Sequence, residues 1–228
     1  MLLHPNETIE ELGDGYRIIQ DKTRFCYGTD AAVLARFAVA KPKERVMDLC
    51  TGTGIIPILM CKTSRCNDFT ALEIQEEMCH IANRSVALNH LEDRLKIICG
   101  DLKKVKELFP SGYFDVVTCN PPYMIPGTGK TNESESIRIA RHETACNLED
   151  VIRSTAYLVK SGGRFYMVHR AERIVDILTL MRQYRLEPKR MTWVSASYHH
   201  EPSLVLIEGQ KDRKSGIIVT KPLYVNME

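Results

Sequence analysis

Strand-like and helix-like segments alternate through most of this chain, and that alternation limits its possible folds more than any other feature. Runs of apolar and β-branched residues predict strands at 45–49, 69–74, 94–99, 114–119 and 163–169. Helical patterns fall between and after them, near 55–64, 75–90, 102–108, 147–159 and 170–184. Strand and helix repeated in this way predict an α/β fold with a doubly wound, mostly parallel sheet.

Both ends of the chain add to this pattern. Segments 189–197 and 203–210 follow one another without a helix between them, which predicts a terminal antiparallel pair. Near the start, 15–20 is a short strand candidate, and 29–39 is a helix candidate capped by Thr29 or Asp30. We therefore expect one domain over 1–228, with an N-terminal lid at 1–40 and a catalytic core at 45–228.

Composition excludes several classes of protein. No apolar run approaches the roughly 20 residues that cross a bilayer, and the acidic N-terminus does not resemble a signal peptide. The eight cysteines include no CxxC pair, and neither they nor the seven histidines show metal-ligand spacing. Free thiols in a reducing compartment predict a cytoplasmic protein without a membrane partner and without a metal.

The first predicted strand runs into a glycine-containing loop, DLCTGTGIIP. Gly52 and Gly54 would let the backbone approach a ligand, but the third glycine of a dinucleotide fingerprint is replaced by Pro57. Asp48 precedes these glycines, and its carboxylate would repel a pyrophosphate. A carboxylate there can instead hold a cationic or amino-bearing ligand, directly or through water. S-adenosylmethionine, which carries a sulfonium, an ammonium and no phosphate, fits this pattern better than NAD.

Two more acids end the next two strands. Glu73 closes the second strand and could accept both ribose hydroxyls, with Ile74 beside it to cover one face of an adenine. Asp101 follows the third strand and could accept from an adenine amino group, with Leu102 alongside. Because parallel strands end at one edge of a sheet, the acids converge on one crevice and predict a cofactor site.

The fourth strand ends in Asn120-Pro121-Pro122-Tyr123. Two prolines stiffen the backbone around the asparagine. This stretch resembles the catalytic motif of methyltransferases that act on nitrogens conjugated to a π-system. The side-chain oxygen of Asn120 and the carbonyl of Pro121 would accept the two N–H groups and free the nitrogen lone pair, while Tyr123 would stack on the planar substrate.

Taken together, ELGDGYRIIQ, RFCYGTDAAVLARF, DLCTGTGIIPILM, TCNPPYM, IARHE and SGGRFYMVHR resemble the bacterial tRNA1(Val) adenine-37 N6-methyltransferase family over about residues 9 to 224. The resemblance implies a Rossmann-like class I methyltransferase fold, whose mostly parallel seven-stranded sheet has its seventh strand inserted antiparallel. It implies S-adenosylmethionine as cofactor, S-adenosylhomocysteine as product, and N6-methylation of an adenine in a tRNA anticodon loop. It also places Tyr27, Thr29 and Asp30 in a segment that packs over the cofactor; read from the residues alone, Tyr27 is core and Thr29 a helix cap.

Other functions share parts of this pattern. Enzymes that methylate a glutamine of release factors also use NPPY, but they carry a helical domain ahead of the core, for which a first core strand near residue 45 leaves no room. An N2-guanine methyltransferase and a non-catalytic RNA-binding protein on the same fold are further alternatives. The GTGKT stretch at 127–131 is no phosphate loop, since Met124 stands where the first glycine is required.

The expected partner is tRNA, and the protein could be a monomer or a weak dimer. Residues 160–228 hold 12 Lys and Arg against 7 Asp and Glu, so this part of the chain is basic. Phosphate-guiding candidates are Arg138, Arg141, Lys160, Arg164, Arg170, Lys189 and Arg190.

Overall fold

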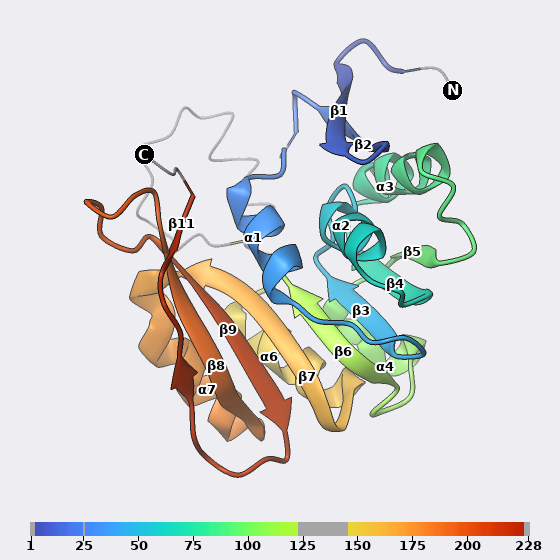
Figure 1. The fold of residues 1–228 in the computed structure, drawn as a ribbon. Helices are drawn as coiled ribbons and strands as arrows, with labels where there is room; N and C mark the ends of the chain where they lie inside the picture. Colours follow the sequence, from blue (N-terminus) through green and yellow to red (C-terminus); the bar gives the residue numbers. More distant parts are fainter. Residues whose placement is uncertain (1–2, 25, 123–145, 226–228) are drawn as a thin grey trace.

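The structure is a computed structural model that describes residues 3–24, 26–122 and 146–225. Its main sheet contains nine strands of the described residues (Figure 1). From one edge to the other they are β10 (Ile218–Val219), β8 (Leu186–Ser195), β9 (Leu204–Lys211), β7 (Val159–Arg170), β6 (Phe114–Cys119), β3 (Arg45–Leu49), β4 (Asp68–Glu73) and β5 (Leu95–Cys99), and β11 (Leu223–Tyr224) also pairs with β8.

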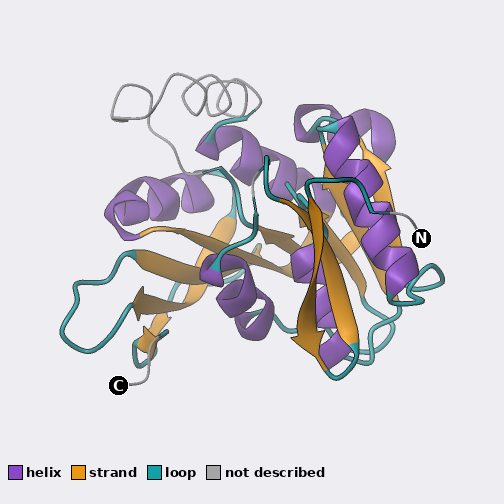
Figure 2. Cartoon of the chain, turned by 90° about the horizontal axis from the view of Figure 1, so that it is seen from above, coloured by secondary structure: helices purple, strands orange, loops and turns teal. Residues whose placement is uncertain are grey.

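Helices cover both faces of this sheet, so the fold has three layers (Figures 1 and 2). On one face lie α1 (Thr29–Phe37), α2 (Ile55–Thr63) and α3 (Glu76–Leu88); on the other lie η1 (Leu102–Lys104), α4 (Val105–Leu108), α6 (Leu148–Leu158), η2 (Ala171–Arg173) and α7 (Ile174–Gln183). Alternate strand residues feed the two cores: Val46 packs into the cluster with α1 and α2, whereas Met47 packs into the cluster with α6 and α7.

The strand order reverses between β3 and β6, and this reversal places the site. From β3 the chain moves outward through β4 to β5, then returns to pair β6 with the other side of β3. Loops that follow β3 and β6 therefore diverge at the carboxyl end of the sheet. Ligands of open α/β sheets bind at such a switch point.

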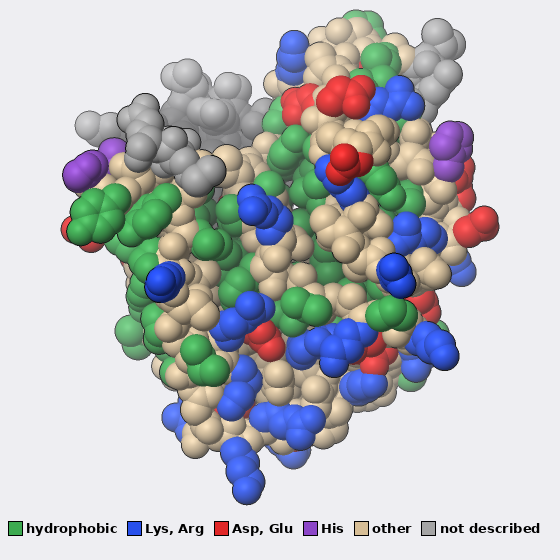
Figure 3. All heavy atoms as spheres, viewed as in Figure 1, with side chains coloured by type: hydrophobic (Ala, Val, Ile, Leu, Met, Phe, Trp, Pro, Cys, Tyr) green, Lys and Arg blue, Asp and Glu red, His purple; other side chains and the backbone are tan. Residues whose placement is uncertain are grey.

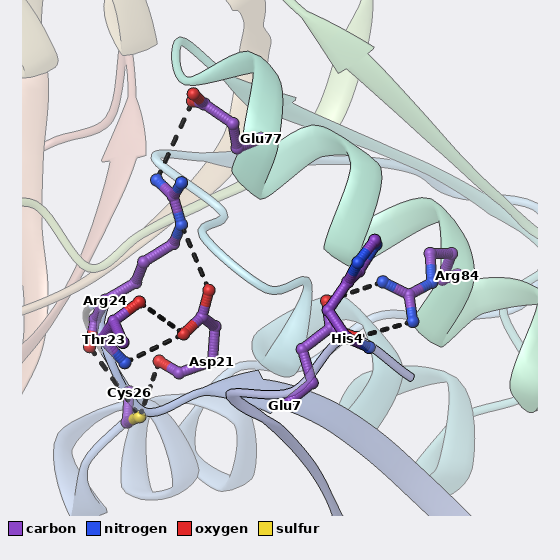
Figure 4. A network of polar contacts seen from close by, with 8 residues as sticks. All are labelled: His4, Glu7, Asp21, Thr23, Arg24, Cys26, Glu77 and Arg84. Carbon is purple, nitrogen blue, oxygen red and sulfur yellow. Dashed lines mark hydrogen bonds and ion pairs between the residues drawn. The ribbon is translucent and has the colours of Figure 1, made fainter. Parts of the chain in front are cut away.

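An N-terminal hairpin, β1 (Glu7–Gly13) with β2 (Tyr16–Asp21), packs on α3. The Glu7 carboxylate pairs with both terminal nitrogens of Arg84, at 2.6 and 2.7 Å, as seen in the close view (Figure 4). The backbone N–H of Ile19 donates to the Ser85 hydroxyl at 3.1 Å. Bidentate pairing fixes geometry as well as adding energy, so the hairpin is firmly docked.

Below the hairpin, a second set of polar contacts holds the segment that leads into α1. Arg24 pairs with Asp21 at 3.3 Å and with Glu77 of α3 at 3.8 Å (Figure 4). Asp21 also accepts from the Thr23 backbone and hydroxyl, at 2.9 and 2.6 Å. These contacts direct residues 26–30 across the carboxyl end of the sheet.

The Rossmann-like fold predicted from the alternation is confirmed, with differences in detail. Among the described strands of the main sheet, only β9 runs antiparallel to the central strands, and it lies between β7 and β8. The predicted terminal antiparallel pair is confirmed, because β8 and β9 pair antiparallel, and the inserted strand agrees with the family resemblance. The strands β1, β10 and β11 were not predicted. Gly28, not Thr29 or Asp30, is the N-cap of α1, and no side chain caps that helix. Within the described ranges, none of the helices has the length and apolar character of a membrane span.

Candidate functional site

A cavity of about 600 Å³ opens at the carboxyl end of the sheet, at the switch point between β3 and β6. Its walls come from the segment before α1, the loops after β3, β4, β5 and β6, and the ends of β7 and β9. Eleven of the cofactor and catalytic residues predicted from the sequence line it: Tyr27, Thr29, Asp30, Gly52, Glu73, Ile74, Asp101, Leu102, Asn120, Pro121 and Pro122. The volume lies within the usual range for small-molecule sites.

The loop after β3 is held against Glu73 of β4. The backbone N–H of Gly52 donates to the Glu73 carboxylate at 2.9 Å, and the backbone N–H of Gln75 donates to its other oxygen at 3.0 Å. Gly52 has φ of 57°, and Cys50 shares this left-handed conformation, which is costly for a non-glycine residue. The buried Glu73 carboxylate therefore both shapes the glycine loop and borders the cavity.

Asp48 lies behind this loop, not in the cavity wall. It is 1% exposed, and one carboxylate oxygen accepts the Thr118 hydroxyl at 2.5 Å across neighbouring strands β3 and β6. Its other oxygen has no hydrogen-bond partner. Burial raises the pKa of Asp48 to about 7. Asp48 is therefore not part of the cavity lining, and its predicted contact with a ligand, directly or through water, stays a prediction.

Gly54 also stands outside the cavity wall. It is the N-cap of α2 with φ of 83°, and a Cβ there would lie 3.6 Å from the Cβ of Ala82 in α3. Its roles are the left-handed turn and close helix packing. Pro57 sits in the first turn of α2 without disturbing the helix, as predicted.

Glu73 and Asp101 border a part of the cavity that also has apolar walls. Ile74 is 46% exposed and borders the cavity, an unusual position for so apolar a side chain. Asp101 caps η1 by accepting from the Lys103 backbone at 2.8 Å, while its other oxygen lies 3.9 Å from the Lys103 ammonium. Leu102 beside it is 6% exposed and lines the cavity as well. A flat ring with polar edges suits this arrangement.

The motif after β6 faces α1 across the cavity. The side-chain nitrogen of Asn120 donates to the Asp30 carboxylate at 3.2 Å. Pro121 is buried and Pro122 exposed, and both line the cavity. Tyr123, and with it loop positions 123–145, lies outside the described residues. Because an ionised carboxylate only accepts, the bond to Asp30 turns the Asn120 oxygen away from α1.

Several cavity residues were not predicted from the sequence. Thr51, Ile55, Ile56 and Met78 come from the loop after β3 and from α2 and α3, and Ser203 and Leu204 come from the start of β9. Arg170, predicted only as a phosphate-guiding residue, also lines the cavity at the end of β7. Ser203 and Leu204 could not be found from the residues alone, because their position depends on the insertion of β9.

The predicted phosphate-guiding residues do not all lie at the cavity. Arg138 and Arg141 lie outside the described residues. Lys160 pairs with Asp115, Arg164 with Glu44, and Arg190 with Glu208, all in the N-terminal halves of β7 and β8. The space-filling view shows Lys and Arg gathered over that end of the molecule (Figure 3). Only Arg170, among the described candidates, lines the cavity.

Among residues 3–24, 26–122 and 146–225, no group of three or more His, Cys, Asp or Glu side chains could hold a metal ion.

Comparison with known proteins identifies the class of domain. A family model described as a methyltransferase domain matches residues 46–131, which span β3 to the end of β6 and the motif that follows. Over these residues the chain is similar to methyltransferase domains. Predicted O-methyltransferase from Agrobacterium tumefaciens has the same fold, with a TM-score of 0.69 and 20% identity over 86% of each chain. A geranyl diphosphate C-methyltransferase from Streptomyces coelicolor, solved with S-adenosyl-L-homocysteine, gives a TM-score of 0.58 at 13% identity, over 79% of this chain and 77% of that one.

Two curated proteins that are similar to this chain have the same name. The tRNA1(Val) (adenine(37)-N6)-methyltransferase of Bacteroides thetaiotaomicron is 26% identical over 193 residues, 84% of this chain and 79% of the relative. The protein of the same name from Porphyromonas gingivalis is 27% identical over 187 residues, 79% of this chain and 72% of the relative. The resemblance predicted from the motifs is confirmed.

Proposed function

We propose that this protein is a methyltransferase that transfers a methyl group from S-adenosylmethionine to N6 of an adenine in tRNA, A37 in the anticodon loop of tRNA1(Val). The observation that carries the proposal is the oriented Asn120 side chain at the mouth of the cavity, on the motif after β6. The curated relatives that match most of this chain are named for that activity.

The cavity fits the cofactor by the chemistry of the groups that line it. Glu73 and Asp101 offer carboxylate oxygens at successive strand ends, where a ribose and an amino group can be bound, and Ile74 offers an apolar face for the adenine. The charge of these acids suits a cation and disfavours a phosphate. The cofactor supplies an electrophilic methyl group on its sulfonium.

The chain's own groups would act by positioning. Asn120, with its nitrogen committed to Asp30, presents its oxygen as an acceptor, and the Pro121 carbonyl is the second acceptor of the motif. Two acceptors on an adenine amino group favour tetrahedral geometry at nitrogen and make its lone pair available. Tyr123 is the stacking residue of this proposal, with Pro122 stiffening the turn. The transferred methyl leaves the nitrogen with an extra, acidic proton, so no strong base is required.

The remaining cofactor contacts belong to the same proposal. Residues 1–40 act as a lid, with Tyr27, Thr29 and Asp30 over the cofactor, and residues 45–228 act as the catalytic core. Burial, together with the neighbouring Glu10 carboxylate, raises the pKa of Tyr27, so its hydroxyl stays a neutral donor at the edge of the cavity. Gly52 brings the backbone close, and Asp48 and Gly54 support the loop from behind.

The deciding experiment supplies labelled S-adenosylmethionine and total tRNA from a host lacking the activity, then analyses the nucleosides. N6-methyladenosine is expected from the wild type and not from Asn120→Ala, while Asn83→Ala, an exposed asparagine on α3, should match the wild type. N2-methylguanosine, or label in an added release factor, would assign a different substrate. Undiminished methylation by Asn120→Ala would refute the role of Asn120.

A further inference from the structure

An exposed aromatic cluster stands on the loop 196–203, between β8 and β9. Tyr198 is 79% exposed, which is exceptional for a tyrosine held in a folded loop. Its ring meets the His199 ring edge-on at 5.5 Å and the Tyr224 ring of β11 edge-on at 6.2 Å. Tyr224 is itself 40% exposed. The His199 and Tyr224 rings thus pack against the Tyr198 ring, which stays largely exposed to solvent.

This cluster is anchored to the rim of the cavity. The loop closes where the Ser203 N–H donates to the Val194 carbonyl at 3.1 Å, and the Ser203 carbonyl accepts from Ala171 at 3.1 Å. Ser203 and its neighbour Leu204 line the cavity, five and six residues beyond Tyr198. Figure 3 shows hydrophobic and histidine side chains together at the upper left, where this loop lies in Figure 1.

The other segment is anchored as well. Strand β11 pairs in parallel with β8, placing Tyr224 opposite Ser195, and the following N–H, of Val225, donates to the Ser195 carbonyl at 3.1 Å. Both ring-bearing segments therefore lie at the carboxyl end of β8, which is the end of the sheet at which the cavity opens. The rings are thus prearranged at the carboxyl end of the sheet, on a loop that continues into Ser203 and Leu204 of the cavity wall.

A base that enters the cavity leaves its neighbours in the strand without a stacking partner. RNA recognition commonly provides aromatic faces for such unstacked bases. Resting on the proposed function, we propose that Tyr198, braced by His199 and Tyr224, is a stacking platform for a base next to the target adenine in the substrate RNA. Continuity with the cavity favours RNA over a protein partner; the aliphatic exposure at Ile218 and Val219 lies further along, on β10.

The test measures kcat and KM of an anticodon stem–loop RNA, together with its Kd by fluorescence anisotropy, for four variants. Tyr198→Ala and Tyr198→Leu should raise the KM and Kd for RNA by roughly five- to a hundredfold, because both lose the aromatic face. Tyr198→Phe should match the wild type. Ile218→Ala, 67% exposed on β10, is the control for general hydrophobic contact and should have no effect. The Kd for S-adenosylmethionine should be unchanged in all four.

A second arm places an abasic nucleotide beside the target adenine. Removing that base should weaken binding to the wild type about as much as Tyr198→Ala does, and the two changes together should cost little more than either alone. Full additivity, an unchanged RNA affinity of Tyr198→Ala, or an effect of Tyr198→Phe equal to that of alanine would each overturn the platform. So would a loss that tracks dissociation of a dimer in sedimentation, which would assign the rings to a second copy of the chain.

The two proposals fail in distinguishable ways. If the wild type methylates no RNA, the proposed function is wrong, and equal stem–loop binding by wild type and Tyr198→Ala would then reject the platform separately. If the wild type methylates RNA and Tyr198→Ala does so with wild-type KM, only the platform is wrong.

Discussion

The side-chain nitrogen of Asn120 donates to the Asp30 carboxylate at 3.2 Å, across 90 positions of sequence. This bond joins the N-terminal segment to the motif after β6 and decides which end of the Asn120 amide faces the cavity. Asp30 also accepts from the Ala31 backbone at 2.8 Å, so its carboxylate is itself oriented. The N-terminal segment is therefore part of the site's geometry and not only a cover over it.

Removing the Asp30 carboxylate should lower the rate of methyl transfer. In Asp30→Ala the Asn120 amide loses the bond that orients its nitrogen, and we expect kcat to fall about tenfold, equivalent to about 1.4 kcal/mol. Asp30→Asn keeps an acceptor oxygen and should recover most of the rate. Single-turnover kinetics at saturating cofactor separates this effect from binding. A wild-type rate in Asp30→Ala, with Asn120→Ala inactive, would show that the bond does not orient Asn120.

Glu73 is expected to control cofactor affinity through two of its contacts. Glu73→Gln replaces one acceptor oxygen by an NH2 donor. Either the Gly52 or the Gln75 backbone N–H then loses its acceptor, and one ribose hydroxyl of the proposed cofactor loses its acceptor as well. A hydrogen bond to a charged group contributes about 1.5–3 kcal/mol. Losing one such bond to the cofactor should therefore raise the Kd for S-adenosylmethionine about ten- to a hundredfold. Calorimetric titration measures it, with Glu92→Gln, an exposed glutamate, as control. Equal affinity in both variants would remove Glu73 from the cofactor site.

Much of this site could be predicted from sequence because parallel strands end at one edge. Glu73 and Asp101 follow separate strands, and Asn120 a third, so alternation alone brings them to one crevice. What could not be predicted depends on contacts distant in sequence. Asp48 is buried against Thr118, which lies 70 positions away in the sequence and donates a hydrogen bond to it. Because aspartate residues are mostly exposed, the sequence alone favoured an exposed position for Asp48.

The order of the last strands and the placement of charge do not follow from the residue pattern. A β8–β9 hairpin has the same pattern whether β8 or β9 lies next to β7, so the insertion of β9 was indicated by the family resemblance and not by the pattern. Likewise, spacing along β7 does not reveal that Lys160 and Arg170 stand at opposite ends of one strand. The basic composition of 160–228 therefore did not translate into a docking surface at the cavity.

Two cysteines that each adjoin a residue of the cavity wall, Cys79 beside Met78 and Cys99 beside Gly100, should join under mild oxidation. The sulfur atoms of Cys79 on α3 and Cys99 on β5 lie 2.7 Å apart, and Cys99 is exposed. Treatment with diamide, which takes up both thiol hydrogens, should link them. The link should also weaken cofactor binding, since Cys99 directly precedes Gly100 and Asp101 of the wall. Peptide mass spectrometry without reduction detects it, with Cys99→Ser as control. Unlinked peptides after treatment would contradict the prediction.

Asp48 should make the stability of the protein depend on pH in a direction opposite to that of an ordinary paired carboxylate. Burial raises its pKa from 3.8 to about 7, so below about pH 4 both folded and unfolded chains hold the proton and its contribution to stability is complete. As the pH rises from about 4 to about 7, only the unfolded chain releases the proton, and stability is lost, by up to about 4 kcal/mol.

Asp48→Asn keeps the shape and an acceptor for Thr118 but does not titrate, so it isolates this contribution. Relative to the wild type, the variant's free energy of unfolding should therefore increase progressively between about pH 4 and about pH 8. Urea titrations across that window measure the difference, and Asp93→Asn, an exposed aspartate, should show none. A constant difference between Asp48→Asn and the wild type would mean that Asp48 ionises normally in the folded chain.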